Sequence, residues 1–278
     1  MTLDEASGHY IMEVVKFHSR PKSSIQQIKV LLNYFDKTVY LSQISKADIS
    51  QFIISKQAKD KVKNGTINRY ITMLSAILHH ANEKWDIKIP AFKISSFKLK
   101  EPVENIEYFK SMEDIKKIIE CSAAHLKPII WTALYTGLRR GNILNLKWEN
   151  IDFERDIITL RVKSKKYDGG KNHIIPIVPP LKDILYNQPQ INEYVFNYNG
   201  HHITDIKHAW SNALKKANLP HQRFHTLRHT TATWLLKDCK NIKIVQHILG
   251  HENVATTNKY AHLMDGAESQ ALTKLFNK

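Results

Sequence analysis

The sequence predicts a mainly α-helical protein with a small β-sheet, divided into an N-terminal helical bundle and a mixed α+β domain. Three observations support this prediction. Apolar residues recur at helical spacing through the first hundred residues, without a strand pattern of useful length. A polar segment with two prolines follows, at residues 90–107. Beyond it, helical patterns resume but are interrupted by two β-branched runs.

The N-terminal bundle is predicted over residues 1–95, and its clearest helix covers 66–85. Thr66 follows an Asn-Gly pair and is expected to cap this helix. One face of the helix carries an apolar stripe: Ile67, Ile71, Leu74 and Leu78. The other face carries Arg69, His79 and His80, polar side chains that are available for contact with a partner.

A linker is predicted at residues 96–107 and a second domain at 108–278. Ser111, with Asp114 three residues later, is expected to cap its first helix. The runs at 156–162 and 173–178 are separated by a polar Gly-Gly turn and predict a β-hairpin. Four helical segments should follow, at 204–217, 226–237, 241–249 and 254–262.

Composition narrows the function classes. The 278 residues carry a formal net charge of +15, with +7 in residues 1–102 and +8 in 103–278. A surplus spread over both parts favours a polyanionic partner, nucleic acid before anionic membrane. Two cysteines, Cys121 and Cys239, exclude a disulfide scaffold and fit a reducing compartment. No apolar run is long enough to span a bilayer, so we expect a cytoplasmic protein without membrane contact.

Four motifs supply the side chains that phosphoryl transfer needs. They are TGLRRGNILNLKW at 136–148, the lysine-rich hairpin turn, HTLRH at 225–229 and LGHENVATTNKY at 249–260. Arginine forks neutralise non-bridging phosphate oxygens, histidine and lysine exchange protons, and a tyrosine hydroxyl is a competent nucleophile. No acidic metal cluster and no cofactor motif is visible, so neither a metal nor a cofactor is expected. The motif H-E-x-x-H of a zinc peptidase fails because position 255 is Ala255.

These four motifs, in this order, resemble the tyrosine recombinases of the phage integrase family. The resemblance covers both parts of the chain, and it implies a core-binding (SAM-like) helical domain followed by a catalytic domain. It implies the catalytic residues Arg139, Lys163 or Lys165, His225, Arg228, His251 and Tyr260. Strand alternation gives Lys163 and Lys165 the same face and sets Lys166 opposite, which leaves the choice between the first two open.

The family's chemistry assigns each residue a role. Tyr260 would attack a phosphodiester of duplex DNA and form a 3′-phosphotyrosyl intermediate, without metal or ATP. The two arginines and His251 would hold the phosphate, His225 would act as base or acid toward Tyr260, and a hairpin lysine would protonate the leaving 5′-oxygen. His229 and His247 are interpreted as packing or hydrogen-bonding residues. One departure is Asn142, where the family usually has an acidic residue.

The resemblance also implies partners and a location. A homo-tetramer on two DNA sites is expected, with a C-terminal apolar face for a neighbouring subunit: Ala267, Leu272, Leu275 and Phe276. Accessory DNA-bending proteins and a place in the prokaryotic cytoplasm or nucleoid, encoded by a phage or mobile element, would fit. Two alternatives share part of the pattern. A type IB topoisomerase would relax supercoils without a specific site, and a non-catalytic helical DNA binder would form no covalent complex.

Overall fold

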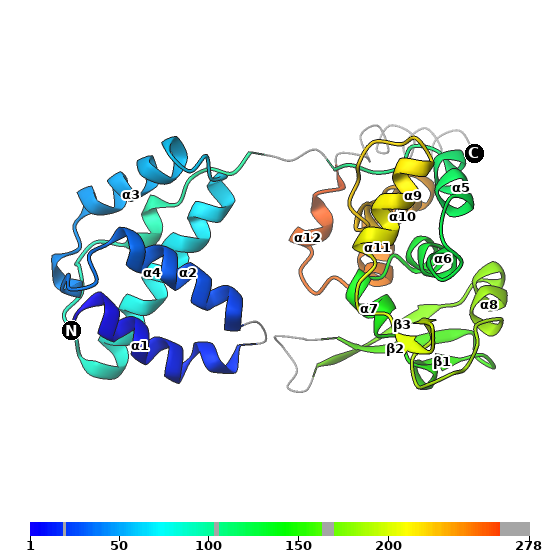
Figure 1. Cartoon of the computed structure of the whole chain (residues 1–278), viewed down its shortest axis with the longest axis horizontal. Coiled ribbons are helices and arrows are strands. Elements are labelled where there is room, and N and C mark those ends of the chain that lie inside the picture. Colours follow the sequence, from blue (N-terminus) through cyan, green and yellow to red (C-terminus); the bar gives the residue numbers. More distant parts are fainter. Residues whose placement is uncertain (19–20, 103–105, 163–169, 262–278) are drawn as a thin grey trace, which may run out of the picture. The chain divides into compact units, whose positions relative to one another are not determined.

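The structure, a computed structural model, describes residues 1–18, 21–102, 106–162 and 170–261. The chain divides into two compact units, Met1–Glu104 and Asn105–Lys278. The first is coloured blue to cyan and the second green to orange (Figure 1). The predicted fold class, mainly α with a small sheet, is confirmed.

The first unit is a helical bundle around one long helix. Its described α-helices are α1 (Leu3–Glu13), α2 (Pro21–Tyr34), α3 (Lys46–Ala58) and α4 (Asn64–Trp85). Helices α1, α2 and α3 all pack on α4 (Figure 1). Reciprocal capping boxes start α1 at Thr2 and α3 at Ser45, because each hydroxyl accepts from the backbone N–H three residues later.

Two predictions about this unit are corrected. Helix α4 begins at Asn64, so Thr66 lies inside its first turn and does not cap it. The predicted linker starts too early, because residue 96 lies in a 3₁₀ helix, Ile94–Phe97. Further along, the Asn68 side chain donates to the Leu99 carbonyl and accepts from the Leu99 N–H, at 2.9 and 2.8 Å. Asn64 donates to the Lys100 carbonyl and Asn68 to the Glu101 carboxylate, so residues up to 101 are fixed to α4.

The second unit combines helices with two small antiparallel sheets. Its described helices are α5 (Met112–Glu120), α6 (Leu126–Thr136), α7 (Arg140–Leu144), α8 (Pro179–Tyr186), α9 (Lys207–Lys216), α10 (Thr226–Cys239), α11 (Ile242–Leu249) and α12 (Ala255–Asn258). The Ser111 hydroxyl accepts from the Asp114 N–H, as predicted for the cap of α5. The predicted helices from 204 onward match α9 to α12 in order, with shorter bounds for α9 and α12.

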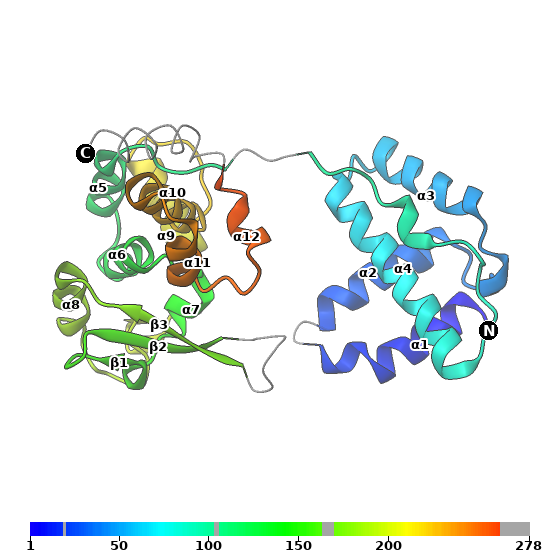
Figure 2. The same ribbon diagram turned by 180° about the vertical axis from the view of Figure 1, so that it is seen from behind.

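The main sheet lies at one end of the second unit (Figure 2). Its strands are β1 (Ile151–Asp152), β2 (Ile157–Val162) and β3 (Lys171–Pro176), in that order. The predicted hairpin is confirmed, since β2 and β3 pair antiparallel from Ile157 opposite Pro176 to Val162 opposite Lys171. A second pair, β4 (Asn197–Tyr198) and β5 (His201–His202), was not predicted.

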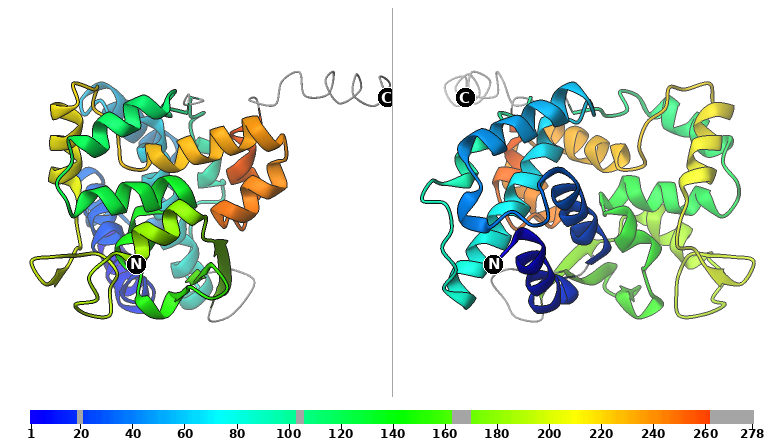
Figure 3. Two further views of the ribbon diagram at one scale, coloured as in Figure 1. Left: turned by 90° about the vertical axis from the view of Figure 1, so that its right-hand side faces the viewer. Right: turned by 60° about the vertical axis from the view of Figure 1, so that its left-hand side comes forward.

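Helix α10 is the element that organises the second unit's interior. It packs on α6 along one side and on α11 along another, and Figure 3 shows the unit from two further sides. The Thr231 hydroxyl of α10 donates to the Leu134 carbonyl of α6 at 2.7 Å. Residues on α10 therefore face the C-terminal turns of both neighbouring helices. In the part of the chain that the structure describes, none of the helices is long and apolar enough to cross a membrane.

Candidate active site

Arg228 is a buried cation at the meeting point of three helices. Its side chain is 3% exposed and comes from the first turn of α10. The guanidinium donates to the carbonyl of Gly137, at the end of α6, and to that of Leu249, at the end of α11 (2.8 Å). Burial, and then the charge of Arg139, lower its pKa to about 10, so it stays cationic at neutral pH. Arg228 thus connects, through these two hydrogen bonds, the turn that carries Arg139 and the turn that carries His251.

Arg139 stands on the first of these turns. Gly137 ends α6 with a φ of +62°, and a Cβ there would lie 2.7 Å from Cδ2 of Leu249. Arg139 then caps the short helix α7 with its backbone and leaves its side chain exposed. Its charge lowers the pKa of both His225 and His251. The arginine therefore adds an accessible cation beside the buried one.

His251 is fixed on the second turn by a glycine and a threonine. Gly250 has a φ of +62° and lies against the ring of His173, where a Cβ would be 2.7 Å from Cε1. Nδ1 of His251 lies 2.8 Å from the Thr257 hydroxyl. Burial, then Arg228, Arg139, Lys259 and His225, lower the pKa of His251 to about 3. The imidazole is therefore neutral at neutral pH, and with the hydroxyl donating to Nδ1 its Nε2–H can donate to an oxygen.

Tyr260 lies after α12, buried in a small apolar cluster. It is 1% exposed and packs with Ala232, Leu236, Val245 and Leu249. Its hydroxyl oxygen lies 2.6 Å from Nδ1 of His229. Burial raises the pKa of the phenol to about 12, with Arg228 opposing the shift. The hydroxyl therefore keeps its proton unless a base removes it.

His225 and Lys259 complete the cluster. His225 precedes α10, and its ring meets that of His229 edge to face at 4.8 Å. Partial burial and the cations Arg228, Lys259 and Arg139 lower the pKa of His225 to about 4. Nζ of Lys259 lies 5.0 Å from the centroid of the Tyr260 ring, and burial followed by the two arginines lowers its pKa. Sequence reasoning missed Lys259, although its place directly before Tyr260 was a usable signal.

The structure thus brings five of the expected residues together: Arg139, His225, Arg228, His251 and Tyr260. Lys163, Lys165, Lys166 and the C-terminal apolar positions lie outside the described residues. The backbone N–H of Asn142 donates to the Arg139 carbonyl at 2.8 Å, inside the turn of α7. His229 was interpreted as a packing or hydrogen-bonding residue, and no partner was predicted for it.

The electrostatics of the cluster suit an anion. In the pKa shifts of its described members, every charged neighbour that acts on a histidine or on Lys259 is a cation or another histidine. Within the described ranges, no group of three His, Cys, Asp or Glu side chains is placed to hold a metal ion. The arrangement offers two arginines, neutral imidazoles and a phenol to one negatively charged group.

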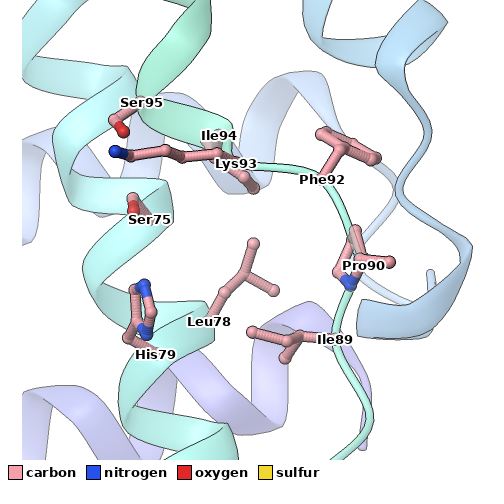
Figure 4. A pocket seen from close by; sticks show the side chains of 10 residues that line it. Ser75, Leu78, His79, Ile89, Pro90, Phe92, Lys93, Ile94 and Ser95 are labelled. Carbon is pink, nitrogen blue, oxygen red and sulfur yellow. The ribbon is translucent and has the colours of Figure 1, made fainter.

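The polar face of α4 that was expected to contact a partner is only partly exposed to solvent. Arg69 and His79 are exposed, whereas the His80 side chain is 12% exposed and its Nε2 lies 2.7 Å from Oε2 of Glu13. His79 lines a pocket of about 380 Å³ between α4 and residues 89–95, which Leu78 and Ile89 also line (Figure 4). His80 is therefore held within the bundle, and the exposed part of this face is carried by Arg69 and His79.

Comparison with known proteins agrees with this site. The model of the phage integrase family matches residues 105–266, which include every described member of the cluster. The integrase of Salmonella phage P22 is 30% identical over 213 residues, which are 70% of this chain and 53% of that protein. The chain therefore spans about half the length of that relative. A tyrosine recombinase of Thermosipho africanus is 26% identical over 91% of this chain and 92% of its own length.

Solved structures share the fold over both units. The Tn1549 transposon integrase in complex with transposon right end DNA matches with a TM-score of 0.80 and 21% identity, covering 100% of both chains. A lambda integrase tetramer bound to a Holliday junction matches with a TM-score of 0.74 and 18% identity, covering 94% of this chain and 77% of that one. At these identities the likeness concerns the fold.

Proposed function

This chain belongs to the phage integrase family, and we propose that it is a site-specific recombinase that cuts and rejoins duplex DNA. The observation that carries this proposal is the buried hydroxyl of Tyr260 beside the cations Arg228, Arg139 and Lys259. A phosphodiester supplies a negative charge that these cations can bind. The matched relatives are named integrases and tyrosine recombinases, and none of them favours a topoisomerase or a non-catalytic DNA binder.

Cleavage begins with attack by Oη of Tyr260 on the scissile phosphorus. The bond from phosphorus to the 5′-oxygen breaks, which leaves a 3′-phosphotyrosyl link and a free 5′-hydroxyl. Because Tyr260 is 1% exposed, its hydroxyl must become accessible to the scissile phosphate when the site is filled. The 5′-hydroxyl of another strand then attacks the phosphotyrosine, so the bond energy is retained and ATP is not needed.

The cations stabilise the charge that develops on the phosphate. Arg139 and the remaining N–H groups of Arg228 donate to the non-bridging oxygens, and His251 adds a neutral donor. His225 exchanges a proton at the site as base or acid, and a hairpin lysine, Lys163 or Lys165, protonates the leaving 5′-oxygen. Loss of one such oxyanion donor typically costs about 3 kcal/mol in the transition state.

Assembly and location follow from the same proposal. The +7 and +8 surpluses of the two parts contact the phosphates of one duplex, so DNA binding weakens steeply as salt rises. Four copies on two DNA sites would exchange strands, with accessory DNA-bending proteins assisting, and the matched lambda integrase is a tetramer on a Holliday junction. The relatives are phage and bacterial proteins, which fits action in the bacterial cytoplasm or nucleoid.

The decisive experiment is a suicide-substrate assay with nicked duplex DNA from the sequence flanking the gene. The parent protein should form a covalent adduct that survives denaturation, whereas Tyr260→Phe should bind the same DNA with unchanged affinity and form none. Adduct formation by Tyr260→Phe would refute the assignment of the nucleophile. Relaxation of supercoiled DNA lacking the site would instead favour a topoisomerase.

A further inference from the structure

We propose that His229 is the base that takes the proton from Tyr260 during strand cleavage, an inference that rests on the recombinase function above. Nδ1 of His229 lies 2.6 Å from Oη of Tyr260, within the reach that a general base requires. The motif-based expectation gave proton exchange with Tyr260 to His225. Among the hydrogen bonds of the described residues, however, the partner of this hydroxyl is His229.

The direction of the proton follows from the two environments. Burial raises the pKa of Tyr260 to about 12, and burial together with nearby Lys259 lowers that of His229 to about 3. At neutral pH a protonated phenol therefore faces a neutral imidazole. The imidazole tautomer that carries its proton on Nε2 accepts the phenol O–H at Nδ1, and it is the tautomer that the proposal requires. This is the ground-state arrangement that proton transfer from the phenol to the imidazole needs.

Both partners are held in place by the fold. His229 follows Arg228 in α10, and the two carbonyl bonds of Arg228 fix that turn of the helix. Tyr260 packs against Leu236 of the same helix and against Val245 of α11. These contacts hold the two side chains within hydrogen-bonding distance in the structure.

The arrival of a phosphate strengthens the base. The charges of Lys259 and Arg228 contribute to the lowered pKa of His229, together with His225 and His251. A phosphodiester bound by these cations offsets their field, so the imidazole of His229 becomes more basic when substrate is present. The pKa of His225 is lowered by Arg228, Lys259 and Arg139 as well, so the same phosphate would raise it too.

The proton balance closes over one cycle. As Oη of Tyr260 bonds to phosphorus, its proton moves to Nδ1 of His229, and the departing 5′-oxygen takes a proton from the acid of the proposed function. In rejoining, the incoming 5′-hydroxyl returns a proton to that acid while the imidazolium of His229 reprotonates Oη. No oxidant, metal or further reactant takes part.

The test uses single-turnover cleavage of the nicked suicide substrate by the full chain. His229→Asn keeps a polar side chain but cannot take up a proton near neutral pH. We expect unchanged DNA affinity and a cleavage rate at pH 7 that falls about 100-fold, in the range typical of a lost general base. The rate of the variant should keep rising with pH where that of the parent is level. Added imidazole should partly restore cleavage by His229→Ala.

Two controls separate the base from other roles. His208→Asn makes the same change at an exposed histidine of α9 and should cleave like the parent. A substrate with a 5′-bridging sulfur needs no acid at the leaving group, and it should not rescue His229→Asn.

Three results would overturn the proposal: parental rates for His229→Asn, rescue by the sulfur substrate, or a loss that is equal at every pH and insensitive to imidazole. Thermal unfolding of the variants reports any change in folding. If the parent itself forms no covalent adduct, the recombinase function fails. If the parent cleaves and His229→Asn matches it, only this inference fails.

Discussion

The two units treat buried polar side chains in opposite ways. In the first unit, Asn68 is 9% exposed, exchanges hydrogen bonds with the backbone of Leu99 and donates to the Glu101 carboxylate. Nearby, His80 is bonded to Glu13. Asn68 and His80 each meet a complementary partner, and in both cases a carboxylate is among the partners. These contacts tie segments of the first unit together.

In the second unit, the hydrogen bonds that Arg228 makes with the described residues go to two backbone carbonyls. These carbonyls satisfy the N–H donors of the buried cation but carry no full charge. His251 and His229 lie near it and are kept neutral at neutral pH. Holding a cation away from water without a counter-ion is unfavourable, and an entering anion relieves this cost. The contrast supports the proposal that the second unit binds the phosphate.

Of the variants considered below, Arg228→Lys should lower the cleavage rate most. Lysine keeps the positive charge but cannot bridge the carbonyls of Gly137 and Leu249. One buried carbonyl loses its donor, and the phosphate loses a fork of N–H groups. Cleavage of the suicide substrate should fall about 100- to 1000-fold. Thermal unfolding of the same variant should occur at a lower temperature.

Arg223→Lys is the matched control, since Arg223 is exposed and precedes the same helix. It should retain the parental rate and melting temperature. A rate for Arg228→Lys within tenfold of the parent would show that charge alone suffices. The buried fork would then not be what distinguishes the second unit from the first.

A glycine pair extends the comparison to the backbone. Gly250→Ala places a Cβ at a φ of +62° against the His173 ring, which is itself held by its bond to the His247 carbonyl at 3.0 Å. We expect a loss of about 1–3 kcal/mol in unfolding free energy. Gly8→Ala, in the middle of α1 with no atom within 4 Å of the new Cβ, should gain about 0.5–1 kcal/mol.

Denaturant unfolding of the two variants measures both values. Opposite signs are the expected outcome, because one glycine is required by a close approach and the other is not. Equal stability for Gly250→Ala would mean that the turn before His251 can relax. The placement of His251 would then not depend on this contact.

The sequence predicts those elements whose pattern is local and long enough to show a periodicity. Helix α10 and the β2–β3 hairpin follow from local periodicity, so their prediction was close. Helix α8 was missed because its eight residues begin with a Pro-Pro pair, and the β4–β5 pair was missed because each strand has two residues. Short elements of this kind carry too little periodicity to stand out.

The site shows the same limit. The motifs identified the types and spacing of Arg139, Arg228 and Tyr260, and the structure places them in one cluster. The contact of His229 with Tyr260 joins positions 31 residues apart, and that of Arg228 with Gly137 joins positions 91 apart. Such pairings arise from the packing of α10 on α6 and α11, which no local pattern reports.

Acidification should weaken the second unit through its histidines. The pKa values of His229 and His251 are lowered to about 3, chiefly by burial, so the folded state binds fewer protons than the unfolded state. Their contribution is present above the unfolded pKa of about 6.5 and is lost as pH falls toward about 3. Within that window, each of the two histidines should lower the unfolding free energy by about 1 kcal/mol for every unit by which the pH falls.

Urea unfolding at pH 7, 6 and 5 measures this slope, and carboxylates that titrate at lower pH contribute to it as well. The difference between the parent and His251→Gln isolates one histidine, because glutamine does not titrate. The variant should show a shallower dependence on pH between 7 and 5. Identical slopes for the two proteins would mean that His251 accepts a proton in the folded state.

The smallest effect is expected where the first unit pairs its polar groups. Glu13→Gln removes the charge that faces His80 and His9, but the Glu13 side chain is 36% exposed and water replaces much of what is lost. Exposed ion pairs are worth about 0–1 kcal/mol, so the unfolding free energy should fall by no more than that. Cleavage should be unchanged, because no member of the described cluster around Tyr260 depends on this pair. A large loss of cleavage with intact stability would contradict the contrast between the units, since it would link this ion pair of the first unit to the chemistry at Tyr260.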